Sequence, residues 1–103
     1  MHQKIENFCS RGGKVLAYLH GHTHNDNYVK DSNMSYPLIS ICGSVNLVNP
    51  PSEMEHAHGN PQQYSRAYGT LSWYCMDLVN VHFDTNVMNL YRFGAGTDRS
   101  FNL

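Results

Sequence analysis

Residues 15–24 read Val15-Leu16-Ala17-Tyr18-Leu19-His20-Gly21-His22-Thr23-His24. The apolar half of this stretch predicts a strand over residues 14–20 that is buried on both faces. Histidines then occupy every second position, and neutral imidazole is the commonest metal ligand in proteins. Gly21 has no Cβ, so the backbone there can turn sharply or approach an ion closely. The stretch therefore predicts a strand with a metal site at its carboxyl end, where open α/β sheets usually bind ligands.

The residues around this stretch predict the other elements of the N-terminal half. Apolar residues such as Ile5 and Phe8 recur at helical spacing in residues 2–11, and glycines follow, which predicts a short amphipathic helix. Residues 25–36 are rich in Asn, Asp and Ser, so we expect a solvent-facing loop. Residues 37–43 form an apolar run that ends in glycine and predict a second buried strand. We expect the end of that strand to lie near the histidines.

The C-terminal half predicts a hairpin. Residues 44–69 contain Asn-Pro-Pro and Gly-Asn-Pro and predict no regular element. Residues 72–83 carry apolar side chains at both odd and even positions, so we expect a strand packed on both sides. A short turn at 84–86 leads into an apolar strand over 87–93, and the two strands predict an antiparallel hairpin. We expect the glycine-rich tail from Gly94 onward to be irregular.

Together these elements predict an α+β fold with one N-terminal helix and about four strands, in a single domain over residues 1–103. A hydrophobic share of 41% in 103 residues builds only a modest core. Seven Lys and Arg against eight Asp and Glu give a net charge of −1, which leaves no electrostatic footprint for nucleic acid or an anionic membrane. The chain lacks both the ~18-residue apolar run of a membrane helix and the pattern of a signal peptide.

The cysteines indicate a reducing compartment. Cys9, Cys42 and Cys75 are odd in number, lie far apart and form no Cys-x-x-Cys pair, so we expect free thiols and a cytoplasmic protein. Within an apolar strand, a free cysteine behaves as a small buried hydrophobe, and we expect this of Cys42 and Cys75. Aromatic core residues are expected in and next to the long C-terminal strand: Trp73, Tyr74 and Phe83.

Two motifs resemble one known family. The chain carries Gly21-His22-Thr23-His24 directly after an apolar strand, which resembles the last metal-binding motif, Gly-His-x-His, of the calcineurin-like metallophosphoesterases. It also carries Tyr91-Arg92-Phe93-Gly94-Ala95-Gly96-Thr97-Asp98-Arg99, which looks like the closing segment of bacterial members of that family. The motifs come in the family's order. The resemblance implies a four-layer αββα sandwich, to which this α+β chain would contribute the C-terminal segment.

The resemblance also implies an enzyme, a metal-dependent phosphoesterase that hydrolyses phosphomonoesters or phosphodiesters. His22 and His24 would each give an imidazole to a different ion of a two-metal centre of Mn, Fe or Zn, with Thr23 as a spacer. Two such ions generate a nucleophile from water and clamp the oxygens of an in-line displacement at phosphorus. His20 and Gly21 would support these ligands without binding metal themselves.

Most ligands of such a centre are absent. The family's earlier motifs, Asp-x-His, Gly-Asp-x-x-Asp and Gly-Asn-His-Asp or -Glu, do not occur in the 103 residues. Two imidazoles cannot replace the bridging carboxylate and the other ligands that those motifs supply. We therefore expect the isolated chain to bind metal weakly and to have little or no phosphatase activity.

Other polar residues have both a functional and a structural interpretation. His56 and His58 would suit a separate metal cluster or a substrate-binding loop, although a solvated polar loop is the simpler interpretation. Asp77 interrupts an apolar strand, where a carboxylate needs a hydrogen-bonding partner, and we favour a structural role for it. Arg92 and Arg99 suit salt bridges better than anion binding.

Two functions of other classes also fit the sequence. His-x-His on a strand occurs in single-metal zinc sites of β-rich proteins, but such a site needs a third protein ligand, for which His56 or His58 is the obvious candidate. A non-catalytic fragment is the other alternative, because a truncated sheet leaves strand edges unpaired and prone to self-association as a homo-oligomer.

Overall fold

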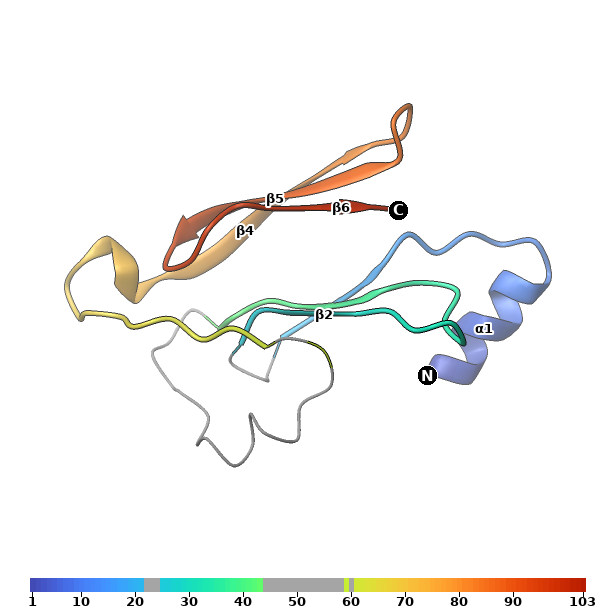
Figure 1. Ribbon diagram of the computed structural model, residues 1–103, viewed down its shortest axis with the longest axis horizontal. Helices are drawn as coiled ribbons and strands as arrows, with labels where there is room; N and C mark the ends of the chain where they lie inside the picture. The colour runs from blue at the N-terminus through green and yellow to red at the C-terminus, as the bar shows by residue number, and fades with distance from the viewer. Residues whose placement is uncertain (22–24, 44–58, 60) are drawn as a thin grey trace.

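The computed structural model describes residues 1–21, 25–43, 59 and 61–103, and over these residues the chain has the expected α+β fold (Figure 1). One N-terminal helix precedes six strands, which form two three-stranded sheets. The elements in chain order are α1 (His2–Ser10), β1 (Tyr18–His20), β2 (Asn27–Val29), β3 (Leu38–Ser40), the 3-10 turn η1 (Leu71–Trp73), β4 (Cys75–His82), β5 (Val87–Gly94) and β6 (Arg99–Asn102).

Helix α1 ends at the predicted glycine. Gly12 has a φ of 91°, and its N–H donates to the carbonyl of Cys9 at 3.0 Å. A left-handed glycine in this place satisfies the last carbonyls of a helix without steric cost. No residue of α1 is buried. A polar contact holds the helix to the segment before β3: the hydroxyl of Ser35 donates a hydrogen bond to the carboxylate of Glu6 at 2.6 Å.

The first sheet has the strand order β1-β3-β2, with β1 parallel and β2 antiparallel to β3. His20 lies opposite Ser40 in the register, so the carboxyl ends of β1 and β3 meet at one edge of the sheet. The central strand β3 is buried as predicted, with Ile39 at 0% exposure, but it covers only Leu38–Ser40 of the predicted residues 37–43. The expectation for residues 14–20 is wrong in part: the strand is shorter, and Leu19 is 39% exposed because β1 is an edge strand.

The second sheet is an antiparallel meander, β4-β5-β6. Its first two strands form the predicted hairpin, with Asp77 opposite Arg92 and a left-handed Asn86 (φ 54°) in the turn. The prediction of an irregular tail is wrong, because β6 pairs along β5 from Leu90↔Arg99 to Val87↔Asn102. The tail can pair because β5 would otherwise present an open edge.

The two sheets lie face to face, and the hydrophobic core is between them (Figure 1). Its buried residues are Ile39 from β3 and both Met88 and Leu90 from β5. The rings of Tyr28 and Phe101 stack across the same interface, with their centroids 4.9 Å apart. Burial of apolar area between the sheets is the main force that holds these small layers together.

Strand β4 is not packed on both sides, which corrects the expectation for residues 72–83. Its burial alternates: Cys75 is 2% exposed, whereas Met76 and Leu78 are 48% and 71% exposed. The strand faces the other sheet on one side only, and in the described residues no element covers its outer side. Tyr74 and Phe83 are likewise exposed and are not core residues, and Trp73 is only half-buried.

The expectation of a solvent-facing loop over residues 25–36 is also wrong in part. Residues Asn27–Val29 form β2, and Asp26 just before it is 2% exposed. The backbone N–H and C=O groups of this segment pair with the open edge of β3. The polar composition of the segment does not predict this pairing. Cys42 and Cys75 are buried as expected, and no cysteine forms a disulfide. Among the described helices, none is long and apolar enough to span a membrane.

Candidate functional site

Four predicted site residues lie outside the described residues: His22, His24, His56 and His58. The structure does describe His20, the last residue of β1, whose ring Nδ1 lies 3.2 Å from the carbonyl of Gly21. At Gly21 φ is not positive, and no described atom lies within 4 Å of where a Cβ would be. The described surroundings therefore do not require glycine at this position.

The chain on both sides of residues 22–24 is tied to the carboxyl end of β3. On one side, the carbonyl of His20 accepts a hydrogen bond from the N–H of Ile41 at 2.9 Å. On the other side, the hydroxyl of Ser40 lies 2.9 Å from the carbonyl oxygen of Asn25 and 3.1 Å from its Oδ1. Ser40 and Asn25 are 2% and 5% exposed. Because buried polar groups are costly to leave unpaired, these bonds fix where the chain leaves and rejoins the sheet.

Asp26 extends this attachment to a further segment. Its backbone forms an antiparallel bridge with Gln62, through N–H to carbonyl bonds of 2.9 and 2.7 Å. Its side-chain Oδ1 accepts the N–H of Cys42 at 2.9 Å. Asp26 therefore joins the chain after residues 22–24, the continuation of β3 and the segment that follows residue 60.

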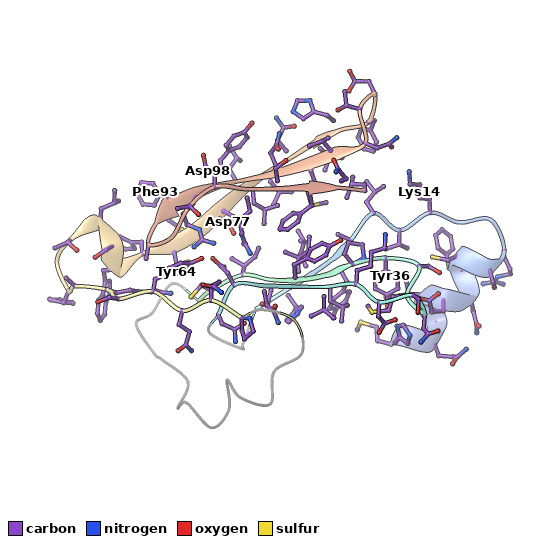
Figure 2. The ribbon with its side chains drawn as sticks, viewed as in Figure 1. Lys14, Tyr36, Tyr64, Asp77, Phe93 and Asp98 are labelled. Carbon is purple, nitrogen blue, oxygen red and sulfur yellow. The ribbon has the colours of Figure 1, made fainter. Side chains whose placement is uncertain are left out.

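Four charged side chains meet between the sheets, and we call them the buried quartet: Asp26, Asp77, Arg92 and Arg99. Arg92 donates from Nε to Asp77 Oδ1 and from Nη2 to Asp26 Oδ2, each at 2.6 Å. Arg99 Nη2 lies 2.6 Å from Asp77 Oδ2 and 3.3 Å from Asp26 Oδ1. Figure 2 shows Asp77 in the space between the two layers. The quartet contains two carboxylates and two guanidinium groups, so its formal charges cancel.

Further hydrogen bonds, most of them to backbone groups, hold the two arginines in place. Arg92 Nη1 donates to the carbonyl of Ala95 at 2.6 Å, and the backbone N–H of Arg92 donates to Asp98 at 2.7 Å. Arg99 Nη1 donates to the carbonyl of Ser40 at 3.2 Å, which brings β6 to the carboxyl end of β3. In the described part of the chain, Arg99 Nε remains buried without a partner.

The electrostatics of the quartet favour the charged form of Arg92. Burial by itself would lower the pKa of Arg92, but the hydrogen bonds and charges of Asp77 and Asp26 outweigh it and raise the pKa above its usual value. Tyr64 lies beside the quartet with the Arg92 guanidinium 5.7 Å from its ring centroid. Burial, together with a hydrogen bond to Asp26, raises the pKa of Tyr64 to about 12. The phenol therefore stays neutral at physiological pH.

This arrangement suits a structural role better than catalysis. Both carboxylates accept hydrogen bonds from arginine, so neither is free to bind an ion. The structural interpretation of Asp77 and the expected salt bridges of Arg92 and Arg99 are confirmed. Over residues 1–21, 25–43, 59 and 61–103, no group of three or more His, Cys, Asp or Glu side chains is arranged to hold a metal ion.

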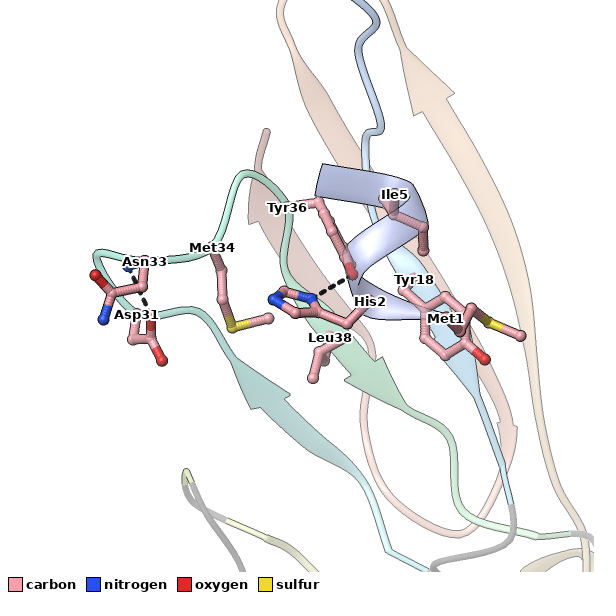
Figure 3. A pocket seen from close by; sticks show the side chains of 9 residues that line it. All are labelled: Met1, His2, Ile5, Tyr18, Asp31, Asn33, Met34, Tyr36 and Leu38. Atoms are coloured by element: carbon pink, nitrogen blue, oxygen red, sulfur yellow. Dashed lines mark hydrogen bonds between the residues drawn. The ribbon is translucent and has the colours of Figure 1, made fainter. Parts of the chain in front are cut away.

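A separate pocket of about 430 Å³ lies between α1 and the first sheet (Figure 3). Its polar contacts include the 2.9 Å hydrogen bond between His2 Nδ1 and the hydroxyl of Tyr36, whose pKa burial raises. The pocket is at the amino ends of β1 and β3, away from the edge that carries His20. It is lined by Met1, His2, Ile5, Tyr18, Asp31, Asn33, Met34, Tyr36 and Leu38.

No family model, curated protein or solved structure matches this chain. Sequence reasoning missed two residues next to the predicted site, Asp26 and Ser40. The only local indication that Asp26 precedes a strand is the apolar pair Tyr28-Val29, which follows it in the sequence and is typical of a strand start. Its buried partners lie far away in the sequence and give no local signal.

Proposed function

We propose that this chain is the C-terminal segment of a calcineurin-like metallophosphoesterase and that His22 and His24 are ligands of its two-metal centre. One observation carries the proposal: β1 and β3 run parallel and end side by side, at His20 and Ser40. Gly21 and the predicted ligands that follow it in the sequence therefore come directly after the carboxyl end of a parallel strand, where open sheets bind their ligands.

The arrangement of the layers gives further support. Two sheets face each other across one core, as the two inner layers of an αββα sandwich would. The outer side of the second sheet is apolar, with Met76, Leu78, Tyr91 and Phe93 each at least 43% exposed. Helices from the rest of such a sandwich would cover this side, because apolar patches of this kind are rarely left open in a soluble protein.

The donor set fits the proposed ions. Imidazole is a good ligand for Zn and Fe, and two imidazoles two residues apart can serve neighbouring ions. When bound, two divalent ions lower the pKa of water and neutralise the charge that develops on a phosphate ester during hydrolysis. The remaining ligands would come from the part of the enzyme that precedes this segment, so the substrate would be a phosphate ester bound between the two parts.

Metal titration tests the ligand assignment directly. Zn²⁺ binding to the 103-residue chain is measured by isothermal titration calorimetry for the wild type and for His22→Ala, His24→Ala and His82→Ala. His82 is an exposed histidine at the end of β4 and is the matched control. The proposal expects each of the His22 and His24 variants to bind less Zn²⁺ than the wild type, because the ion that the replaced imidazole would hold loses its ligand from this chain. The control variant keeps wild-type affinity.

The same titration separates the alternatives. If His22→Ala and His24→Ala bind Zn²⁺ as the wild type does, the assignment of these ligands is wrong. If His56→Ala or His58→Ala loses as much affinity as His24→Ala, a single-metal site with a third histidine from this chain replaces the two-metal proposal.

A further inference from the structure

The apolar pocket between α1 and the first sheet has no part in the proposed function. We propose that this pocket binds a small amphipathic cation, whose apolar body enters the pocket and whose amine lies beside the carboxylate of Asp31. The inference goes beyond phosphoester hydrolysis and does not depend on the proposed metal ligands.

The pocket forms because α1 covers the sheet incompletely. Ile5 and Phe8 lie at helical spacing, but no residue of α1 is buried. A helix on the surface of a domain normally buries its apolar side against its neighbours. On the sheet, Tyr18 and Leu38 begin β1 and β3, lie opposite each other in the parallel register and line the pocket. The space left between helix and sheet is about 430 Å³, which is within the range of small-molecule sites.

Most of the lining offers apolar contact. Tyr36 is 1% exposed, and its hydroxyl is already paired with Nδ1 of His2 at 2.9 Å. Its ring therefore contributes to the wall, while its polar end is taken up by another side chain. Met34 is half-buried in the same lining, and a flexible thioether side chain adapts to the shape of a ligand. The body of the ligand is accordingly apolar.

The charge of the lining decides the other half of the ligand. Among the described residues that line the pocket, Asp31 is the one acidic residue and none is Lys or Arg. Asp31 Oδ1 accepts the backbone N–H of Asn33 at 2.7 Å, and the carbonyl of Asp31 accepts that of Met34 at 3.2 Å. These bonds form a turn that fixes the carboxylate. In the described part of the chain Oδ2 has no hydrogen-bond partner, so it can accept from an amine.

Figure 3 shows how the two halves of such a ligand fit. Asp31 and Asn33 lie on one side of the pocket, Tyr18 lies on the other, and Met34 and Leu38 lie between them. An amine beside Asp31 therefore places its apolar part over Leu38 and towards Tyr18. An anion would meet a like charge, and a neutral ligand would leave the carboxylate without a counter-charge. The lining favours a primary amine on a short apolar chain or ring.

Three probes with the same apolar body test the inference: phenylbutylamine, phenylbutanol and phenylbutyrate. Each probe is titrated into the full chain and followed through the backbone amide signals in nuclear magnetic resonance spectra. We expect the amine to cause saturable shifts of the amides of Ile5, Met34 and Leu38. The alcohol should bind about two- to fivefold more weakly, because an ion pair at an exposed carboxylate contributes modestly. The anionic probe should bind more weakly than the alcohol.

Two matched pairs of variants test the charge and the place of binding. Asp31→Asn removes the charge but keeps an oxygen that can accept the N–H of Asn33, and Asp84→Asn changes an exposed acidic residue in the hairpin turn. Met34→Trp fills the pocket, and Met76→Trp places the same ring on the outer side of the second sheet. The spread of the amide signals shows whether each variant is folded.

Asp31→Asn should lower the affinity for the amine to that for the alcohol, whereas Asp84→Asn should keep the difference between the two probes. Met34→Trp should abolish the saturable shifts with both probes, and Met76→Trp should bind both as the wild type does. If Met34→Trp does not fold, the comparison of Asp31→Asn with Asp84→Asn decides alone.

The inference is overturned if the amine shifts no amide around the pocket, if the alcohol binds the wild type as tightly as the amine, or if Asp31→Asn keeps the preference for the amine. Saturable shifts that persist in folded Met34→Trp, or that are lost in Met76→Trp, would place binding on another surface and overturn it as well. None of these results changes the assignment of His22 and His24, which the Zn²⁺ titrations test separately.

Discussion

Arg92 Nη2 donates to Asp26 Oδ2 at 2.6 Å across a sequence separation of 66 residues. Because Asp26 precedes β2 and Arg92 lies in β5, this bond joins the two sheets. Removing charges from water is costly, so a buried ion pair stabilises a fold only when hydrogen bonds satisfy its remaining atoms. The quartet meets that condition almost completely through Cys42, Ala95 and the carbonyl of Ser40.

Removal of one carboxylate from the quartet should be severely destabilising. Asp77→Ala leaves the guanidinium groups of Arg92 and Arg99 buried with only Asp26 to balance them, and we expect a loss of about 3–5 kcal/mol in the free energy of unfolding. Urea titration followed by circular dichroism measures it. Asp84→Ala, in the exposed hairpin turn, is the control and should stay within about 0.5 kcal/mol of the wild type. Equal midpoints for the two variants would show that the quartet contributes little.

The two faces of the second sheet should respond differently to truncation. Leu90 is fully buried and Leu78 is 71% exposed. We expect Leu90→Ala to lower the free energy of unfolding by about 2–5 kcal/mol, because it leaves a cavity between the sheets. Leu78→Ala should change it by less than about 0.5 kcal/mol. A large effect of Leu78→Ala in the same denaturation assay would mean that the outer side of the sheet is covered in solution.

The sequence predicted the elements whose signal is local. Helix α1 was predicted from the apolar spacing in residues 2–11 and from the glycines that follow. The hairpin was predicted from the apolar runs on both sides of residues 84–86. Each of these signals lies within a short stretch of sequence, and the structure has both elements. The strands β2 and β6 were missed because they are only three and four residues long, and β6 is largely polar. Such strands form only because a neighbouring strand offers an open edge, which is a property of the assembled sheet.

The candidate site divides in the same way. The histidine-rich stretch can be recognised as a candidate metal site from its residue types and their spacing. Asp26 lies in a polar run, and nothing in that run predicts that its side chain is buried. Its burial depends on Arg92 and Arg99, which are distant in the sequence and whose contact is created by the stacking of the sheets. The prediction of two-sided packing for residues 72–83 was wrong for a related reason. Apolar residues at both odd and even positions of a strand do not show which face of the sheet is covered by another element.

Substitution of Gly96 should cost more than substitution of a glycine with the same backbone conformation. Gly96 and Gly12 have φ values of 96° and 91°, so alanine is strained at both positions. A Cβ at Gly96 would also lie 2.6 Å from Arg92 Nη1 and 2.8 Å from the ring of Tyr64, whereas none lies within 4 Å at Gly12. We expect Gly12→Ala to cost about 1 kcal/mol and Gly96→Ala clearly more in thermal denaturation. Identical losses would argue against tight packing around Arg92.

Stability should fall at alkaline pH in part because of Cys75. Burial raises the pKa of this thiol from 9.0 to about 12, so the unfolded chain loses the proton first. The stabilising contribution is therefore fully present below pH 9 and is lost as the pH rises toward 12, with a slope of up to about 1.4 kcal/mol per pH unit. Cys75→Ala should flatten the curve of unfolding free energy between pH 9 and 11. Met76→Ala, the neighbour without a titratable group, should keep the wild-type slope; a parallel curve for Cys75→Ala would contradict the prediction.

The last prediction concerns catalysis. The isolated chain should hydrolyse p-nitrophenyl phosphate at no more than the background rate with Mn²⁺, Fe²⁺ or Zn²⁺, because two imidazoles leave each ion short of protein ligands.

In a longer enzyme that contains this segment, His22→Ala and His24→Ala should each lower turnover by orders of magnitude, since an ion with an incomplete set of ligands is held weakly and lowers the pKa of water less. His20→Ala and His58→Ala are the matched controls and should have milder effects. Metal content by elemental analysis and hydrolysis rates are measured on the same folded samples. Full occupancy and wild-type rates in the His22 and His24 variants would exclude them as ligands, while a dominant effect of His20→Ala would move the site by one histidine along the chain.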